Sequence, residues 1–341
     1  MNTLPIKLRP ATAWRTYIGG SLIRELHNNI GTKDDHFPEE WIMSTVIARN
    51  SGREDIVEGQ SIAEDGTPLI ELINNDPISM LGAEHYKKHG TNLGVLVKLI
   101  DSAERLTVQV HPTREAAEKL FSSQFGKTEC WHILGGRSIG GEEPCVYFGF
   151  KEGITREYWK KCFDLQDIPA MLNCLHKFNV KKGDTFLIEG GIPHAIGAGC
   201  FLIEIQEPTD YSVRTERVTP AGLSVPDFMC HQGLGFDKMF DCFTYQGYPK
   251  AEVAKRWCIK QKGNTIIDYS NTKMFRLEHY FTQNAQITSE GLFSGIYILG
   301  GSGNILGSPI KKGDQFFIPA DCDSFQVNGN VEFVRFYGPS L

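Results

Sequence analysis

The sequence predicts a mainly β protein made of two small β-sandwiches or barrels, with a helical insertion in the first. Three observations lead to this prediction. Short β-rich segments recur along the chain, glycine and proline turns separate them, and one strand-turn-strand pattern occurs twice. A chain of 341 residues has room for two such domains and a substantial core. We expect the first domain over residues 1–240, with the insertion at about 151–178, and the second over 241–341.

The duplication is visible in two pairs of matching segments. Trp131–Gly136 resembles Ile296–Gly301, and Lys181–Phe186 resembles Lys311–Phe316. Both matches occur in the same order, which is typical of an internal repeat. The two segments lie further apart in the first copy, so we place the helical insertion between them.

Individual β-rich segments alternate polar and apolar side chains with a period of two. In one segment Thr107, Gln109 and His111 fall on the same face, and in another Glu204 and Gln206 do. We expect these polar faces to line a cavity and the apolar faces to pack on a neighbouring layer.

Helices are expected at four places. Thr113 is a typical N-cap for the helix that follows it, and Pro68 suits the first turn of a helix that ends near Asn75. In the insertion, residues 155–163 and 169–176 carry apolar side chains at helical spacing.

Composition argues against several classes of protein. The net charge of −6 argues against a nucleic-acid-binding surface. No apolar run reaches the length of a membrane span, and the N-terminal residues lack the apolar core of a signal peptide. The nine cysteines form no CxxC pair. We therefore expect free, mostly buried thiols in a cytoplasmic protein with neither nucleic-acid nor membrane partners.

One group of residues in the first copy has the composition of a metal site. Gln109 and His111 lie two apart on a strand, where both can face one ion, and Glu129 and His194 lie at the ends of other strands. Two imidazoles, a carboxylate and an amide oxygen suit zinc or another first-row divalent ion. Because it has no thiolate ligand, such a site is expected to be catalytic rather than structural.

The second copy lacks these ligands. The positions that match Glu129 and His194 are Ser294 and Ser324. A single histidine near a strand end is more often structural than metal-binding. The loss of both ligands in the second copy nevertheless indicates that only the first copy is kept for chemistry.

Six parts of the chain carry a more specific pattern. They are, in chain order, Trp14–Gly20, Glu39–Trp41, Leu106–Pro112, Gly126–Glu129, Pro193–Ala195 and Arg214. Together they resemble type I mannose-6-phosphate isomerases over most of the chain, and the combination of Gln-x-His-Pro with Lys-x-Glu is specific. The resemblance implies two cupin domains (jelly-roll β-sandwiches or barrels) with zinc in the first. It also implies the interconversion of mannose 6-phosphate and fructose 6-phosphate through an enediol(ate).

The resemblance further implies roles for nine residues. The zinc ligands are Gln109, His111, Glu129 and His194, the catalytic residues are Arg214, Lys127 and Glu204 as candidate base, and the phosphate contacts are Lys98 and Thr107. Each catalytic or phosphate-binding role has an ordinary alternative. Glu204 would face solvent on a strand, Arg214 would form a surface salt bridge, Lys127 would lie in a solvated turn, and Lys98 would pair with a carboxylate.

Two features depart from the family pattern. The longer signature has Asn-His before the lysine, where this chain has Phe125-Gly126. The helical insertion is also shorter than in the large eukaryotic forms, which fits a compact bacterial form.

Three functions are compatible with these residues. The favoured one is a metal-dependent sugar-phosphate isomerase, for which zinc, manganese and cobalt all suit the ligands. The second is another cupin enzyme, such as an oxygenase, although oxygenases favour a facial triad with positions open to oxygen. The third is a non-catalytic sugar-binding or sensor protein. It is disfavoured because Lys127, Glu204 and Arg214 are all present.

Overall fold

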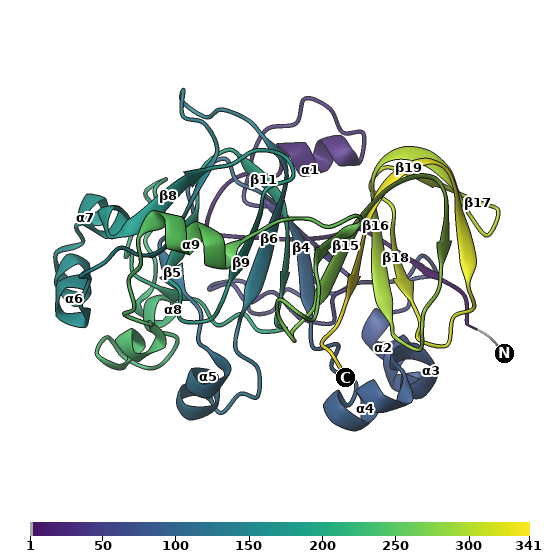
Figure 1. Ribbon diagram of the computed structural model, residues 1–341, viewed down its shortest axis with the longest axis horizontal. Coiled ribbons are helices and arrows are strands. Elements are labelled where there is room, and N and C mark those ends of the chain that lie inside the picture. The colour runs from purple at the N-terminus through teal and green to yellow at the C-terminus, as the bar shows by residue number, and fades with distance from the viewer. Residues whose placement is uncertain (1–2) are drawn as a thin grey trace.

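The structure, a computed structural model, describes residues 3–341. Its strands form three sheets, with short helices around them (Figure 1). The first two sheets lie on the left and in the centre of Figure 1, and the third, built largely from the last part of the chain, lies on the right. The predicted mainly β class is confirmed.

Each sheet is given by its strands in order of pairing. The first contains β13 (Cys258–Ile259), β9 (Thr185–Ile188), β6 (Glu129–Gly136), β11 (Cys200–Gln206), β4 (Leu96–Asp101), β3 (Glu39–Ile42) and β2 (Ala11–Ala13). The second contains β12 (Val213–Arg214), β5 (Gln109–Val110), β10 (His194–Ile196), β7 (Cys145–Phe150) and β8 (Leu175–Asn179). The third contains β1 (Ile6–Leu8), β18 (Gln315–Ile318), β16 (Ser294–Ile305), β19 (Phe325–Tyr337), β15 (Arg276–Ile287) and β14 (Thr265–Ile267), with β17 (Ser308–Lys311) paired to β16.

The helices are short and lie outside the sheets. They are α1 (Ser21–Leu26), α2 (Leu69–Asn75), α3 (Pro77–Leu81), α4 (Ala83–His89), α5 (Arg114–Phe121), α6 (Arg156–Leu165), α7 (Ile168–Asn173), α8 (Asp227–His231), a 3-10 helix (Lys238–Cys242) and α9 (Lys250–Trp257). Helices α2 to α4 lie below the third sheet in Figure 1, and α6 and α7 lie at the far left beside β8. Among the described residues, no helix has the length and apolar character needed to span a membrane.

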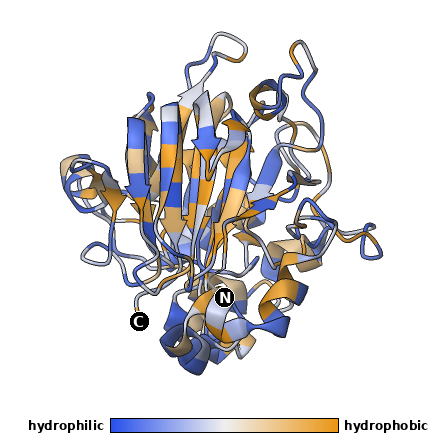
Figure 2. Ribbon diagram, turned by 90° about the vertical axis from the view of Figure 1, so that its right-hand side faces the viewer, coloured by the Kyte–Doolittle hydropathy of each residue, from blue (hydrophilic) through white to orange (hydrophobic). Residues whose placement is uncertain are grey.

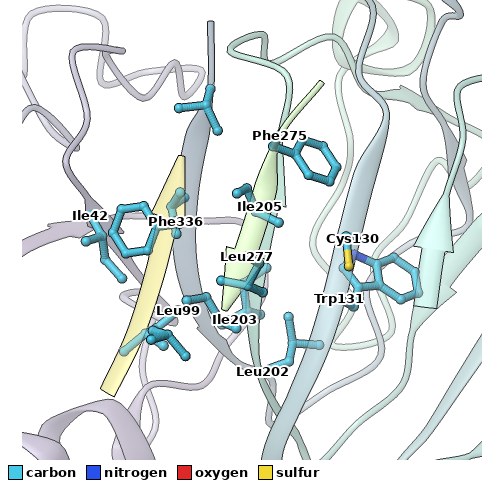
Figure 3. Close-up of a cluster of buried hydrophobic side chains, with 14 of the residues drawn as sticks. Ile42, Leu99, Cys130, Trp131, Leu202, Ile203, Ile205, Phe275, Leu277 and Phe336 are labelled. Carbon is cyan, nitrogen blue, oxygen red and sulfur yellow. The ribbon is translucent and has the colours of Figure 1, made fainter. Parts of the chain in front are cut away.

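The first sheet packs one apolar face against the third sheet. Leu99 of β4 and Ile203 and Ile205 of β11 lie close to Leu277 and Phe336 of the third sheet (Figure 3). All five side chains are 0% exposed, and burying such a side chain stabilises the fold by about 1.5–3 kcal/mol. Figure 2 shows the alternation behind this packing as changes between hydrophilic and hydrophobic colour along the strands. The neighbouring residues of β4 and β11 therefore point to the opposite face, where the candidate site lies.

The internal repeat has a counterpart in strand register. In the first sheet, β6 pairs with β9 so that Trp131 lies opposite Phe186. In the third sheet, β16 pairs with β18 so that Ile296 lies opposite Phe316. These are the same positions that match in the sequence, so the two copies share their strand pairing as well as their residues.

In the second copy, an arginine occupies the position that a glutamate occupies in the first. Ser294, which matches Glu129, is buried and accepts a hydrogen bond of 3.0 Å from Arg335 Nε. Arg335 occupies on β19 the register position that Glu204 occupies on β11. A fixed cation beside the lost ligand position opposes the binding of a metal ion there.

Most helix predictions agree with the structure, with one correction. Thr113 caps α5 by accepting a backbone N–H at 3.1 Å, and α2 ends at Asn75. The second helix of the insertion was expected to reach His176, but α7 ends at Asn173 and residues 175–179 form β8. The helix prediction is wrong there because pairing with β7 supplies the backbone hydrogen bonds and outweighs local helical spacing.

The division into domains near residue 240 stays a prediction. Two short strands cross it, since β1 joins the third sheet and β13 joins the first. Each of these sheets therefore uses residues from both sides of the division.

Candidate active site

Three predicted metal ligands lie together at one end of the polar face of the first sheet. Glu129 begins β6, His194 begins β10, and His111 directly follows β5. The Nε2 atom of His111 is 3.1 Å from Glu129 Oε2, that of His194 is 3.4 Å from Glu129 Oε1, and the two Nε2 atoms are 3.2 Å apart. Each side chain is at most 1% exposed, so the cluster is closed to bulk water.

The hydrogen bonds around both histidines leave a nitrogen free to bind a metal. His111 Nδ1 lies 2.8 Å from the Tyr211 carbonyl, and His194 Nδ1 lies 2.8 Å from the Ile192 carbonyl. Because a carbonyl only accepts, each Nδ1 carries the proton and each Nε2 presents its lone pair. Burial lowers the pKa of His194 and, together with Lys127, lowers the pKa of His111 to about 4. Both rings are therefore neutral at pH 7.

Glu129 is the anionic member of the cluster. Burial would raise the pKa of its carboxyl, but Lys127 holds that pKa well below its usual range. Its Oε1 is buried and accepts no hydrogen bond from the described residues. Two imidazole lone pairs that face each other beside an unsatisfied carboxylate oxygen are a donor set that a divalent cation satisfies. The residues therefore fit a metal ion.

Lys127 lies inside this cluster. Its Nζ is 2.8 Å from Glu129 Oε2 and 2.8 Å from His111 Nε2, and the residue is 3% exposed. It is therefore not the solvated turn lysine that was the alternative. Its ammonium group places a second cation directly beside the ligands.

Gln109 and Arg214 reach the site from neighbouring strands. Gln109 on β5 lies opposite both His194 on β10 and Arg214 on β12. Residues directly opposite on antiparallel strands share a face of the sheet, so these three side chains point to the same side. The role of Gln109 as the fourth ligand stays a prediction.

Arg214 has its charge free for an anionic partner. Its Nη1 donates to the carbonyls of Ser212 and Met229 at 3.0 and 3.1 Å. No carboxylate among residues 3–341 forms an ion pair with it at the 4.0 Å limit. Burial lowers the pKa of Arg214, but a guanidinium remains charged at pH 7. The surface salt bridge considered as an alternative does not form.

A cavity of about 660 Å³, counted out to its open mouth, lies beside the cluster. Predicted site residues that line it are Lys98, Thr107, Gln109, Lys127, Glu204 and Arg214. The remaining three predicted site residues form the buried cluster that Lys127 contacts. The structure thus brings all nine to one region.

Glu204 and Lys98 lie opposite each other on β11 and β4, and both are buried. Lys98 Nζ is 3.2 Å from Glu204 Oε1 and 3.9 Å from Glu39 Oε2, while Trp131 Nε1 donates to Glu204 Oε2 at 3.1 Å. Burial would lower the pKa of Lys98, but Glu39 and Glu204 raise it. Glu204 is therefore not solvent-facing, and Lys98 does have carboxylate partners. Their roles as base and phosphate contact stay predictions.

Glu39 is a pocket residue to which sequence reasoning gave no role. It accepts hydrogen bonds from Tyr17 Oη at 2.7 Å and Trp41 Nε1 at 2.7 Å, and its Oε2 lies 2.9 Å from Arg15 Nε. Burial would raise the pKa of Glu39, but Arg15 and Lys98 lower it to about 2. Glu39 thus forms ion pairs with two cationic residues that line the pocket, Arg15 and Lys98.

We expect Glu39→Gln to remove a pH-dependent part of the stability. A carboxyl whose pKa is lowered on folding stabilises the protein above its ordinary pKa near 4.5, and this contribution is lost as the pH falls toward about 2. At 1.36 kcal/mol per pKa unit, the contribution is of the order of 3 kcal/mol. The measurement is urea unfolding of both proteins at about pH 7 and about pH 3. A stability difference that does not shrink at the lower pH would contradict this account.

Gly126 stands where the family signature has a histidine, and no side chain fits there. A Cβ would lie 2.7 Å from the Pro112 carbonyl oxygen and 2.9 Å from the Arg114 nitrogen. We expect Gly126→Ala to cost about 1–3 kcal/mol, measured by thermal unfolding. Gly135→Ala is the matched control, because a Cβ there meets only Phe201, at 4.0 Å. Equal melting temperatures for the two variants would show that the close contact has no cost.

Comparisons with known proteins find similarity to one group of isomerases. A family model, the catalytic domain of type I phosphomannose isomerase, matches residues 14–127, which include Gln109, His111 and Lys127. A mannose-6-phosphate isomerase from Streptococcus mutans is 26% identical over 287 residues, which cover 81% of this chain and 84% of that protein.

Solved structures match the fold over the whole chain. The mannose 6-phosphate isomerase from Bacillus subtilis has a TM-score of 0.73 at 21% identity, covering 98% of this chain and 100% of that one. The apo form of the enzyme from Salmonella typhimurium has a TM-score of 0.74 at 14% identity, covering 99% and 100%. These likenesses support the predicted two-cupin fold. The chain is thus similar to type I phosphomannose isomerases in sequence over residues 14–127 and in fold over nearly its whole length.

Proposed function

We propose that this chain is a zinc-dependent aldose-ketose isomerase that interconverts mannose 6-phosphate and fructose 6-phosphate through an enediol(ate). The observation that carries the proposal is the His111, Glu129 and His194 cluster beside a pocket lined by cationic residues. We assign one zinc ion per chain, with Gln109 as the fourth ligand. Amide, imidazole and carboxylate ligands without thiolates favour a catalytic site.

The chemistry moves one proton between two carbons and another between two oxygens. A zinc ion held by the cluster supplies a positive charge that polarises the substrate carbonyl. Arg214 adds a fixed positive charge for the oxygen that becomes anionic, and such preorganised groups are worth about 10²–10³-fold in rate. Lys127 donates a hydrogen bond to the same region. Glu204 is our candidate for the base that carries the carbon-bound proton, which contributes about 10²–10⁴-fold.

The charge of the pocket suits a sugar phosphate. Its lining residues include five cations (Arg15, Lys98, Arg105, Lys127 and Arg214) and three acids (Glu39, Glu204 and Asp210). Glu216 and Glu129 already pair with Arg105 and Lys127. A phosphate monoester, which carries a charge of about −1.5 to −2 at pH 7, suits the cations that remain. We assign its contacts to Lys98 and Thr107. For Lys98, this requires the phosphate to share the ammonium with Glu204 and Glu39.

Two further assignments belong to this proposal. The second cupin, residues 241–341, braces the first and binds no metal, in keeping with Ser294 and Arg335 at the matching positions. The protein works in the cytoplasm on a small-molecule sugar phosphate, in keeping with nine free cysteines.

A substrate panel tests the proposed reaction. The purified protein is incubated separately with mannose 6-phosphate, glucose 6-phosphate and unphosphorylated mannose, and the ketose product is measured. We expect fructose 6-phosphate from the first sugar at a rate well above that from the other two. Faster conversion of glucose 6-phosphate would move the assignment to another sugar-phosphate isomerase. No conversion of any sugar by metal-loaded protein would favour another cupin enzyme or a sugar sensor.

A further inference from the structure

One buried amide nitrogen in the pocket has no hydrogen-bond partner in the described structure. Asn50 lines the cavity and is 5% exposed. Its Oδ1 accepts a hydrogen bond of 3.5 Å from Arg15 Nη1, while its Nδ2 is buried and donates to nothing among residues 3–341. Exchanging the two amide atoms would place an N–H donor against the Arg15 donor, so this orientation is the favoured one. A buried donor without a partner is costly and indicates a ligand that supplies the acceptor.

The neighbours of Asn50 determine which chemical group fits. Arg15 lies between two carboxylates, with Glu39 Oε2 at 2.9 Å from its Nε and Asp210 Oδ2 at 3.6 Å from its Nη1. A phosphate dianion carries no N–H or O–H group that these two carboxylates could accept. A hydroxyl group donates one hydrogen bond and accepts two, so it matches a site that offers both amide or guanidinium donors and a carboxylate acceptor.

The strand order places Arg15, which Glu39 holds, away from the metal-ligand cluster. Glu129 lies on β6, whereas Glu39, which holds Arg15, lies on β3, three strands further along the sheet. At a strand spacing of about 4.8 Å, the two backbones are about 14 Å apart. If the proposed function is correct, the carbonyl end of the sugar lies at the cluster, and the Arg15 end of the pocket faces the remainder of the sugar.

We propose that Asn50, with Arg15 and Asp210, binds a secondary hydroxyl group of the sugar that takes no part in isomerisation. The inference rests on the proposed function for the orientation of the substrate. Asn50 is then a specificity-determining residue, because a sugar that lacks this hydroxyl leaves its Nδ2 unpaired. In the open-chain form, whose carbonyl reacts, the hydroxyl groups at C3, C4 and C5 of mannose 6-phosphate take no part in the reaction and carry no phosphate.

The test compares mannose 6-phosphate with its 3-deoxy, 4-deoxy and 5-deoxy analogues. Wild-type protein is expected to lose about 5- to 10-fold in kcat/KM on one analogue, the size of one hydrogen bond. In Asn50→Ala that loss should disappear, because the amide that donates to the hydroxyl group is gone. The KM of this variant for mannose 6-phosphate should rise, while kcat changes little. Asn50→Asp keeps the shape and replaces the donor by an acceptor, so it should bind mannose 6-phosphate less well than Asn50→Ala. The exposed Asn75→Ala is the control and should behave as wild type.

Two results would overturn the proposal. One is that the losses in kcat/KM on the deoxy analogues are the same in Asn50→Ala as in wild type. The other is an Asn50→Ala variant that instead loses its preference for mannose 6-phosphate over mannose, which would make Asn50 a phosphate contact. Calorimetry measures how tightly the protein binds mannose 6-phosphate and its deoxy analogues. It therefore tests the role of Asn50 independently of the proposed isomerase activity. Wild-type protein that binds mannose 6-phosphate without turning it over contradicts the isomerase, and the binding ratios still decide the role of Asn50.

Discussion

His194→Ala is expected to lose both its bound metal and its turnover. His194 is fully buried, and its Nε2 lone pair faces Glu129 Oε1 at 3.4 Å and His111 Nε2 at 3.2 Å. Alanine removes one of the two imidazole ligands and leaves nothing that can replace it. Loss of an outer partner of a ligand alone costs about 10–100-fold in metal affinity, so loss of the ligand should cost at least about 100-fold. Metal content by elemental analysis and the isomerase rate measure the two effects.

His176→Ala provides the matched control for this variant. His176 is also a buried histidine on a strand, 6% exposed, but its Nε2 bonds to the Tyr248 carbonyl at 2.8 Å, outside the cluster. It should lose stability and keep both metal and turnover. A His194→Ala protein with normal metal content and normal turnover would show that the site assignment is wrong.

Arg214→Ala is expected to keep its metal and lose its turnover. The guanidinium donates hydrogen bonds to the carbonyls of Ser212 and Met229, and within residues 3–341 it donates none to His111, Glu129 or His194, so we expect its removal to leave the cluster intact. In the proposed mechanism it supplies charge to the developing oxyanion, and loss of one such group costs about 10²–10³ in kcat. Arg214→Lys should recover only part of the rate, because one ammonium group cannot reproduce the fork of the guanidinium.

Metal analysis and kinetics of the same preparations test this separation of roles. Arg217→Ala, three residues further on and outside the lining of the pocket, is the control and should stay within about twofold of wild type. If Arg214→Ala lost its metal together with its activity, Arg214 would be a structural support of the cluster and not a group that acts on the substrate.

The predicted strands and their faces came from local pattern. Alternation placed Glu204 and Gln206 on one face of β11 and Ile203 and Ile205 on the other, and the apolar pair does pack on the third sheet. Pairing between distant segments could not be predicted in the same way. β1 joins the third sheet through pairing between residues 6–8 and 315–317. No local pattern in the sequence predicts this pairing.

The grouping of Glu129 and His194 was predictable because the repeat supplied an internal comparison. Glu129 and His194 stand out once their counterparts are seen to be serines. Arg15, Asn50 and Asp210 have no such counterpart, and the sequence shows each as an ordinary polar residue. Only the fold brings them to one cavity.

Glu39 did leave a signal in the sequence. Glu39 and Glu40 are consecutive in a β-rich segment next to Trp41, and strand alternation sends them to opposite faces of β3. Both are buried. Glu39 faces the pocket, while Glu40 accepts from Gln315 of the third sheet at 3.1 Å and lies 2.6 Å from His27. Two adjacent acids in an apolar strand could have indicated two buried polar partners, although not their identity.

The most direct measurement follows mannose 6-phosphate conversion to fructose 6-phosphate in a coupled assay. The rate is measured on the protein as purified, after chelation, and after zinc is added back in steps up to one ion per chain. The account predicts that chelation abolishes turnover and that zinc restores it in proportion to occupancy, with no restoration in His194→Ala. Full turnover in protein shown to be free of metal, or no turnover with one zinc bound, would contradict it.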